Sequence, residues 1–242
     1  MPDIQPSDFY ALAQAPRHCK GSDNDTDGTA QGAEKDPPGT LLGPISHDRP
    51  AILPHEFGTR PTLVWDTETA GLGAPGICQL SYILIEDGKL TEYDKILKLP
   101  EKVRMSSQAT SIHRITAEAS AAGTHASPEL LSFWELAQRV MRSGGEVVGH
   151  NVAFDCRAFE FTCAKLGLTH ELKHSHMVDT MALSKPHTHL RNVRGHPKQY
   201  RLSELYERLF GAPPDWARLH DSLEDVRVTT LCFREGRRIG WW

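Results

Sequence analysis

The segment Leu63-Val64-Trp65-Asp66-Thr67-Glu68 is an apolar run that ends at two carboxylates. Such a run predicts a buried strand that reaches the edge of a sheet at Asp66. Side chains alternate along a strand with period two, so Asp66 and Glu68 are expected to share one face. An isolated Asp-x-Glu pair is common in polar loops, so its meaning depends on what the rest of the chain brings to it.

Residues 77–99 predict two antiparallel neighbours for this strand. The run from 77 to 85 is rich in β-formers, and the pair Asp87-Gly88 is typical of a hairpin turn before a second, alternating arm. A hairpin at this place in the chain indicates a sheet that begins with antiparallel strands.

The second half of the chain alternates between helical and strand patterns. A helix is predicted after Ser127-Pro128, a strand over residues 146–149, and a helix over residues 152–166 with Asn151 as its N-cap. Further helices are predicted over residues 202–210 and after Ser222. Together with the hairpin, this order predicts an α/β domain with a mixed sheet covered on its faces.

The N-terminal 58 residues differ in composition from the rest of the chain. Residues 1–50 carry eight acidic and four basic side chains, which accounts for the whole formal net charge of -4. Frequent Pro and Gly with little apolar periodicity predict a disordered acidic tail over residues 1–58, followed by one domain over residues 59–242. Such a tail could recruit a partner such as a polymerase or a repair protein. Oligomeric state has no signature in the sequence.

Composition also limits the protein's class and location. The 242 residues are 39% hydrophobic and 24% charged, which is typical of a globular chain. There is neither a signal-peptide pattern nor an apolar run near the roughly 20 residues that span a bilayer, so we expect an intracellular protein of the cytoplasm or nucleus that does not bind membranes. Its 5 cysteines lack CxxC spacing, which argues against a disulfide framework or a cysteine zinc site.

Three motifs look informative and are better explained as ordinary segments. Residues 71–76 match GxGxxG, but Pro75 and the strand pattern that follows disfavour the helix that a dinucleotide site requires. Residues 23–34 match a calcium loop without the two flanking helices of an EF-hand. The pairs His174/His176 and His187/His189 are more simply solvated loop histidines than zinc ligands.

Two distant segments give the Asp66/Glu68 pair its weight. Asp155 falls in the first turn of the helix that follows the predicted strand over residues 146–149. Asp225 falls near the start of the last helix, five positions after His220. Four converging carboxylates would raise one another's pKa values unless a cation neutralised them. Hard divalent ions take oxygen ligands, and pairs of them cleave phosphodiesters, with a histidine well suited to accept a proton.

The chain resembles the DnaQ-like DEDDh 3′–5′ exonucleases, of the ribonuclease H-like superfamily, in three motifs. They are Val64 to Leu72, Gly149 to Asp155 and His220 to Asp225, and the secondary resemblances around His113, Asp179 and Glu204 extend the match over about residues 62–233. The resemblance implies a ribonuclease H-like fold with a five-stranded mixed sheet whose first three strands are antiparallel.

The same resemblance implies roles for individual residues. Asp66, Glu68 and Asp225 would bind two Mg²⁺ ions, with Mn²⁺ as a substitute, Asp155 would assist, and His220 would be the general base. The substrate-binding residues implied by the family are Thr67 at the terminal 3′-hydroxyl, Leu72 as a wedge against the terminal base, and Asn151 and Phe154 in the nucleotide pocket. Leu72 and Phe154 could instead be ordinary core residues.

These features predict a metal-dependent exonuclease that releases nucleoside 5′-monophosphates from 3′ ends, with single-stranded or mispaired DNA ends as the expected substrate. A 3′–5′ exoribonuclease is the alternative within the enzyme class, because nothing in the sequence reports on the 2′-hydroxyl. A nucleic-acid-binding scaffold subunit that keeps the fold without the activity is the alternative outside it. The basic segment 185–201 is either a contact for phosphates or a solvated face.

Overall fold

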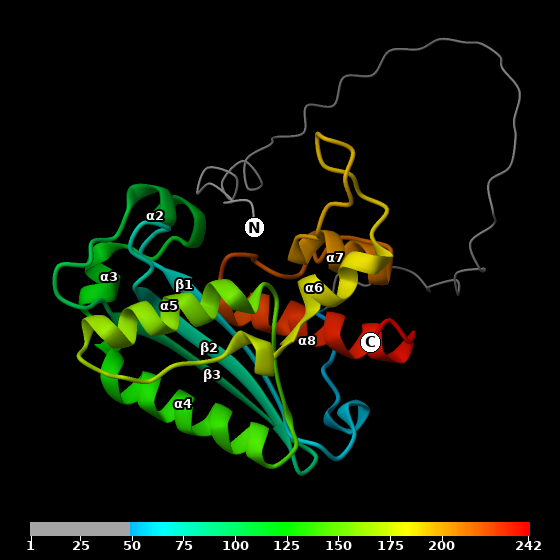
Figure 1. Ribbon diagram of the computed structural model, residues 1–242, viewed down its shortest axis with the longest axis horizontal. Coiled ribbons are helices and arrows are strands. Elements are labelled where there is room, and N and C mark those ends of the chain that lie inside the picture. Colours follow the sequence, from blue (N-terminus) through cyan, green and yellow to red (C-terminus); the bar gives the residue numbers. More distant parts are fainter. Residues whose placement is uncertain (1–48) are drawn as a thin grey trace, which may run out of the picture. The chain divides into compact units, whose positions relative to one another are not determined.

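The computed structural model describes residues 49–242, and the predicted α/β architecture is confirmed there (Figure 1). Most of the predicted acidic tail, including the calcium-loop pattern at residues 23–34, lies outside the described residues. The boundary at residue 58 therefore stays a prediction. Within the predicted tail, residues 54–57 form the short 3-10 helix η1, and Ile52 and Phe57 pack against the apolar core.

Six strands form one mixed sheet in the spatial order β4-β3-β2-β1-β5-β6. They are β1 (Thr62–Thr69), β2 (Ile77–Glu86), β3 (Lys89–Lys98), β4 (Thr124–His125), β5 (Glu146–Gly149) and β6 (Val178–Asp179). As predicted, β1, β2 and β3 are antiparallel neighbours, whereas β5, β6 and β4 pair in parallel with β1, β5 and β3. The sheet has one strand more than the five expected, because short strands pair at both of its edges.

The turn between β2 and β3 has the chemistry that its sequence predicts. Asp87 and Gly88 both adopt positive φ angles, of 51° and 70°. Two such residues in succession form the tight hairpin turn whose twist matches that of the flanking strands. At the sheet edge, a Cβ on Gly123 would lie 2.7 Å from the carbonyl oxygen of Ile96, so glycine permits the approach that lets β4 pair with β3.

The helices follow the sheet in chain order. They are α2 (Ser107–His113), α3 (Ala117–Ala121), α4 (Ala126–Arg142), α5 (Val152–Lys165), α6 (Thr180–Ser184), α7 (Leu202–Phe210) and α8 (Ser222–Arg238), with the 3-10 turns η1 (Pro54–Phe57), η2 (His174–His176) and η3 (Lys185–His187). Among residues 49–242, no helix combines the length and apolar composition needed to cross a bilayer.

Two helix starts differ from the sequence prediction. Helix α4 begins at Ala126, with His125 rather than Ser127 in the N-cap position. Asn151 precedes α5 as predicted, but its φ of 69° places it in the left-handed region and its side chain makes no capping hydrogen bond. A side-chain cap normally requires an extended N-cap backbone, so the polar group of Asn151 is left for other contacts.

Strand β1 supplies side chains to both layers of the core. Leu63 and Trp65 pack in the cluster that includes Phe133 of α4 and Phe159 of α5. The intervening Val64 packs on the other face, in the cluster that includes Val226 and Phe233 of α8. All three β1 side chains are at most 1% exposed, so the strand is fixed between the two layers before it reaches Asp66.

Candidate active site

The alternation along β1 continues past its apolar part and separates the polar side chains by face. Asp66 and Glu68 follow Val64 toward α8, whereas Thr67 follows Trp65 toward α5. The side-chain contacts agree with this, because the Glu68 carboxylate lies within 4.8 Å of Asp225 in α8, while the Thr67 hydroxyl donates to Asp155 in α5. The last residues of one strand therefore meet two helix N-termini.

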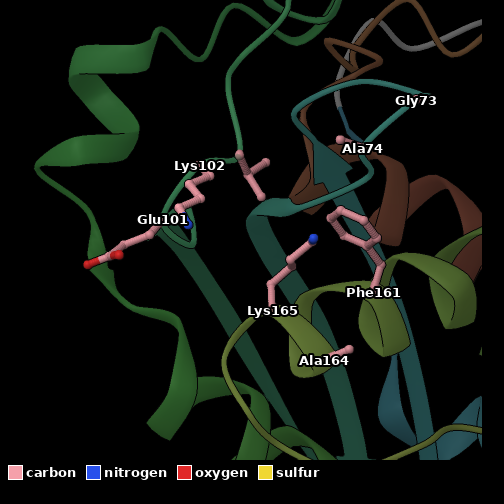
Figure 2. A pocket seen from close by; sticks show the side chains of 8 residues that line it. Gly73, Ala74, Glu101, Lys102, Phe161, Ala164 and Lys165 are labelled. Carbon is pink, nitrogen blue, oxygen red and sulfur yellow. The ribbon is translucent and has the colours of Figure 1, made fainter.

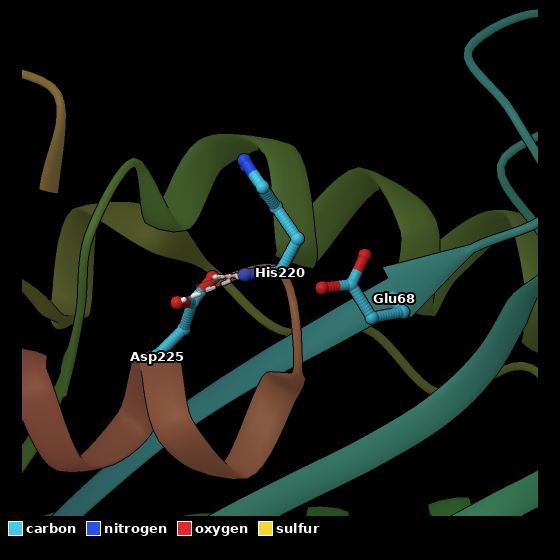
Figure 3. A group of neighbouring side chains, drawn as sticks. All are labelled: Glu68, His220 and Asp225. Carbon is cyan, nitrogen blue, oxygen red and sulfur yellow. Dashed lines mark hydrogen bonds between the residues drawn. The ribbon is translucent and has the colours of Figure 1, made fainter. Parts of the chain in front are cut away.

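Three of the five predicted catalytic residues form a compact cluster. Carboxylate oxygens of Glu68 and Asp225 and a ring nitrogen of His220 all lie within 4.8 Å of one another (Figure 3). Glu68 comes from β1, His220 from the loop before α8, and Asp225 from the first turn of that helix. A group of this size and composition can hold a metal ion.

Asp155 is held by β1 on the α5 side of the strand. Its Oδ1 accepts hydrogen bonds from the backbone N–H of Thr67 at 3.1 Å and from the Thr67 hydroxyl at 2.6 Å. Asp155 lies in the first turn of α5 and is 4% exposed. The helix dipole and the two donors both favour its anionic form.

His220 presents its ring outward. Its backbone φ of 66° is uncommon for a residue other than glycine. In this conformation its backbone N–H donates to both carboxylate oxygens of Asp225 at 3.3 Å. The ring stands clear of this backbone contact, with one nitrogen within 4.8 Å of Glu68 and Asp225 oxygens, and the residue is exposed (Figure 3). Surrounding protein atoms lower its pKa below the ordinary 6.5, because they disfavour the charged imidazolium.

The surroundings of the four carboxylates raise all of their pKa values. Burial and the neighbouring carboxylates raise the pKa values of Asp66 and Glu68 well above their ordinary range. Burial raises the pKa values of Asp155 and Asp225 to about 7, although the Thr67 donors oppose the rise at Asp155. Within residues 49–242, none of the four forms an ion pair with lysine or arginine. No lysine or arginine among the described residues therefore neutralises these carboxylates through an ion pair.

The predicted substrate-binding residues belong to β1, the loop that follows it, and the start of α5. Leu72 is half-buried in the loop of residues 70–76, which leads directly into β2 as its sequence indicates. Phe154 is half-buried in the first turn of α5, with the Arg157 guanidinium 6.0 Å from its ring centre. Asn151 immediately precedes α5, and Thr67 already uses its N–H for Asp155. Their contact with a substrate stays a prediction.

Supporting residues emerge that the sequence pattern did not assign. Ser222 is fully buried and ties α8 to the end of β1. Asp179 accepts hydrogen bonds from the backbone N–H groups of Asn151 and Met181, at 2.9 and 3.0 Å, so it fixes the start of α5. His113 Nδ1 accepts from Ile115, which leaves Nε2–H to donate to the carbonyl of Thr69 at 3.1 Å. The secondary motifs were the only sequence signal for His113 and Asp179, whereas Ser222 lies inside the third main motif.

The comparisons with known proteins agree with this architecture. The family model RNase_T, described as Exonuclease, matches residues 63–233. A comparison with curated protein sequences found no match.

Solved structures of nucleases share the fold. The chain is similar to Exonuclease X in complex with 5′ overhanging duplex DNA (24% identity, TM-score 0.52, covering 75% of this chain and 94% of that one). It is also similar to a 3′-exonuclease that recognises a histone mRNA stem-loop (14% identity, TM-score 0.57, covering 75% of this chain and 83% of that one). A third similar structure is E. coli Exonuclease I in complex with a dT13 oligonucleotide (16% identity, TM-score 0.55, covering 75% of this chain and 43% of that one).

Proposed function

Because the chain belongs to the RNase_T exonuclease family, we propose that it is a metal-dependent 3′–5′ exonuclease that releases nucleoside 5′-monophosphates from 3′ ends. The observation that carries the proposal is the cluster of Glu68, His220 and Asp225 beside Asp66, at the end of β1. It supports a reaction in which a hydrolytic water is activated next to a site for hard cations.

The residues present fit a divalent cation. Asp66, Glu68, Asp155 and Asp225 offer only oxygen donors, and burial together with neighbouring carboxylates raises their pKa values, a cost that a cation would relieve. Oxygen-only donors suit Mg²⁺ and Mn²⁺. Asp66, Glu68 and Asp225 would hold two such ions with help from Asp155, and the ions would orient the phosphate, acidify water and neutralise the leaving oxygen.

His220 would act as the general base. Its lowered pKa keeps the ring neutral, and therefore able to accept a proton, near pH 7. It takes the proton of the attacking water while the water oxygen bonds to phosphorus, and the bond from phosphorus to the 3′-oxygen of the preceding nucleotide breaks. The exposed ring leaves room for this approach.

The terminal nucleotide would lie between β1 and α5. Leu72 would press on its base, Asn151 and Phe154 would line its pocket, and the backbone near Thr67 would meet its 3′-hydroxyl. The Asn151 side chain supports this role, because it is not used to cap the helix.

DNA is the expected substrate, and RNA remains the second candidate because similar folds act with each. One similar structure holds duplex DNA, and another recognises a histone mRNA stem-loop. Only a group that contacts the 2′-hydroxyl would separate the two substrates.

The test offers single-stranded DNA and RNA with free or blocked 3′ ends, in Mg²⁺ and in EDTA. We expect stepwise release of mononucleotides from free 3′ ends, loss in EDTA and with Asp66→Ala, and a fall of roughly 10²–10⁴-fold with His220→Ala. Asp215→Ala and His174→Ala, at exposed positions outside the site, are the matched controls and should leave the rate unchanged. Equal cleavage of blocked ends would identify an endonuclease, and binding without cleavage would identify a scaffold.

A further inference from the structure

A cavity of about 540 Å³ lies outside the group of proposed catalytic residues. Its walls come from the loop after β1 at Gly73, the turn after β3 at Lys102 and Val103, and the last turns of α5 at Phe161 and Lys165 (Figure 2). The volume is within the range of roughly 300–1,000 Å³ that small-molecule sites occupy.

The cavity is lined by two lysines and one aromatic ring. The Lys165 ammonium lies 5.3 Å from the centre of the Phe161 ring, and neither Lys102 nor Lys165 has an ion-pair partner in the part of the chain that the structure describes. Glu101 also lines the cavity but turns its carboxylate away from Phe161 (Figure 2). Lys102 has a φ of 66°, an uncommon left-handed conformation for lysine.

The walls are tied together by hydrogen bonds and close packing, so the cavity is preformed. The N–H of Ala70 donates to the carbonyl of Gly76 at 2.8 Å, which closes the loop on itself. A Cβ on Gly76 would lie 2.8 Å from a methyl of Val103, so the loop packs closely on the turn after β3. The N–H of Ile77 donates to the buried Thr162 hydroxyl at 3.0 Å, which fastens α5 beside them.

Helix α5 connects this cavity to the proposed active site. Phe154, Arg157, Phe161 and Lys165 follow one another at spacings of three and four residues, so they lie along one side of the helix. Each phenylalanine has the next cation within 6.0 Å of its ring centre. Phe154 and Phe161 are about 10 Å apart along the axis. Aromatic rings interleaved with cations are typical of surfaces that bind nucleic acid.

We propose that the cavity binds one nucleotide unit of a nucleic acid, with its base against Phe161 and its phosphate between Lys102 and Lys165. The proposal rests on the proposed function only for the identity of the ligand. Every base has a face that stacks on an aromatic ring, and an ammonium is a point charge suited to phosphate. The nucleotide belongs either to the strand being cleaved or to the opposite strand of a duplex, which share this chemistry.

Binding in EDTA tests the cavity without cleavage. The affinity of the full chain for single-stranded DNA and for a duplex with a 5′ overhang is measured by fluorescence anisotropy over a salt series. We expect Phe161→Leu, which keeps apolar packing, to weaken binding roughly tenfold to at least one of the two DNAs. The double variant Lys102→Ala/Lys165→Ala should also weaken the salt dependence of binding to that DNA. If the DNA is single-stranded, the slope of log affinity against log salt should fall in magnitude by about 1.4, because two cations are removed.

Lys89→Ala is the matched control. Lys89 is exposed at the other end of β3 from the cavity, about 30 Å from the Lys98 end, and has no ion pair among residues 49–242. It should change neither affinity nor slope. Unchanged affinity and slope in both cavity variants, for both DNAs, would overturn the proposal even if the chain hydrolyses DNA. A loss of affinity in a chain without hydrolysis would support the cavity and reject the proposed function.

Photocrosslinking of the unaltered chain identifies which strand supplies the nucleotide. A single 5-iodouracil is placed at successive positions from the 3′ end of a single strand, or in the opposite strand of the overhang duplex, and the crosslinked peptide is found by mass spectrometry. We expect one position in one of these two arms to mark Phe161. Crosslinks that mark other residues in both arms, and never Phe161, would overturn the proposal.

Discussion

Thr67 donates two hydrogen bonds to a single oxygen of Asp155, one from its backbone N–H at 3.1 Å and one from its hydroxyl at 2.6 Å. The two residues are 88 positions apart and are only 5% and 4% exposed. The contact joins β1 to the first turn of α5 and fixes how the Asp155 carboxylate is oriented. Thr67 is therefore a positioning residue for a proposed metal ligand, in addition to any contact with substrate.

Replacing Thr67 by valine tests this role. Valine keeps the shape of threonine and removes the hydroxyl, so Asp155 keeps only the backbone donor. We expect the rate of nucleotide release to fall about 10–100-fold, and the Mg²⁺ concentration for half-maximal rate to rise, because such outer contacts orient metal ligands. Thr67→Ser should restore both quantities. A valine variant with an unchanged Mg²⁺ requirement would contradict the positioning role.

The proposed metal site is expected to lower the stability of the metal-free protein. Glu68 has a strongly raised pKa because it is buried beside Asp225 and Asp155. Glu68→Gln removes one of these charges, so we expect the free energy of unfolding in EDTA to rise by about 1 kcal/mol, while activity is lost. The gain should disappear in Mg²⁺, which stabilises only the native carboxylate site. Urea titrations check this, and Glu207→Gln, at an exposed position, should change neither value.

Local patterns predicted the elements whose signals lie within a few residues. The apolar run of β1, the Asp87-Gly88 turn and the helix α7 each depend on neighbouring side chains, and the structure has all three. Strands β4 and β6 are two residues long and exist because the chain returns to the sheet edge, so their sequence has no period to detect.

The carboxylates of the site were predictable because their motifs stand at element ends. Their contacts were not. The bond between Thr67 and Asp155 depends on how α5 packs against β1, and the left-handed backbone of Asn151 overrides its usual preference as a cap. The cavity at Phe161 is built by three elements that are far apart in the chain, so no pattern within a single element predicts it.

We expect the buried ring of His150 to lower the free energy of unfolding when the pH falls. Its ring bonds to the Thr180 hydroxyl and the Tyr200 carbonyl, and burial lowers its pKa to about 4, although the charges of Asp179 and Glu204 oppose this. The native ring stays neutral while the unfolded ring takes up a proton below pH 6.5, so its stabilising contribution is present above that pH and is lost progressively between about 6.5 and 4.

The measurement is urea unfolding at pH 7.5 and 5.5. The His150 contribution at pH 5.5 should be smaller by about 1.4 kcal/mol than at pH 7.5. The site carboxylates change stability in the opposite direction, so the comparison is with His150→Gln, whose amide can also accept and donate. That variant should lose less stability on acidification than the parent. His174→Gln, at an exposed ring, should follow the parent, and identical pH dependence for all three proteins would reject the prediction.

The basic segment 185–201 divides into paired and unpaired cations, which changes which residues should bind phosphates. The Lys198 ammonium lies 2.5 Å from Glu204, whose other oxygen accepts the backbone N–H of Arg201, so this end of the segment holds the start of α7. Arg191 and Arg194 are exposed, and neither forms an ion pair within residues 49–242.

Unpaired arginines release counterions when they meet phosphates, whereas a lysine already neutralised by Glu204 must first give up that partner. We therefore expect Arg191→Ala/Arg194→Ala to lower the salt slope of single-stranded DNA affinity by about 1.4, and Lys198→Ala to lower it by less while reducing the urea midpoint. Anisotropy titrations at several salt concentrations measure the slopes. If the arginine pair leaves the slope unchanged, the segment is a solvated face, and the strand is held elsewhere on the protein.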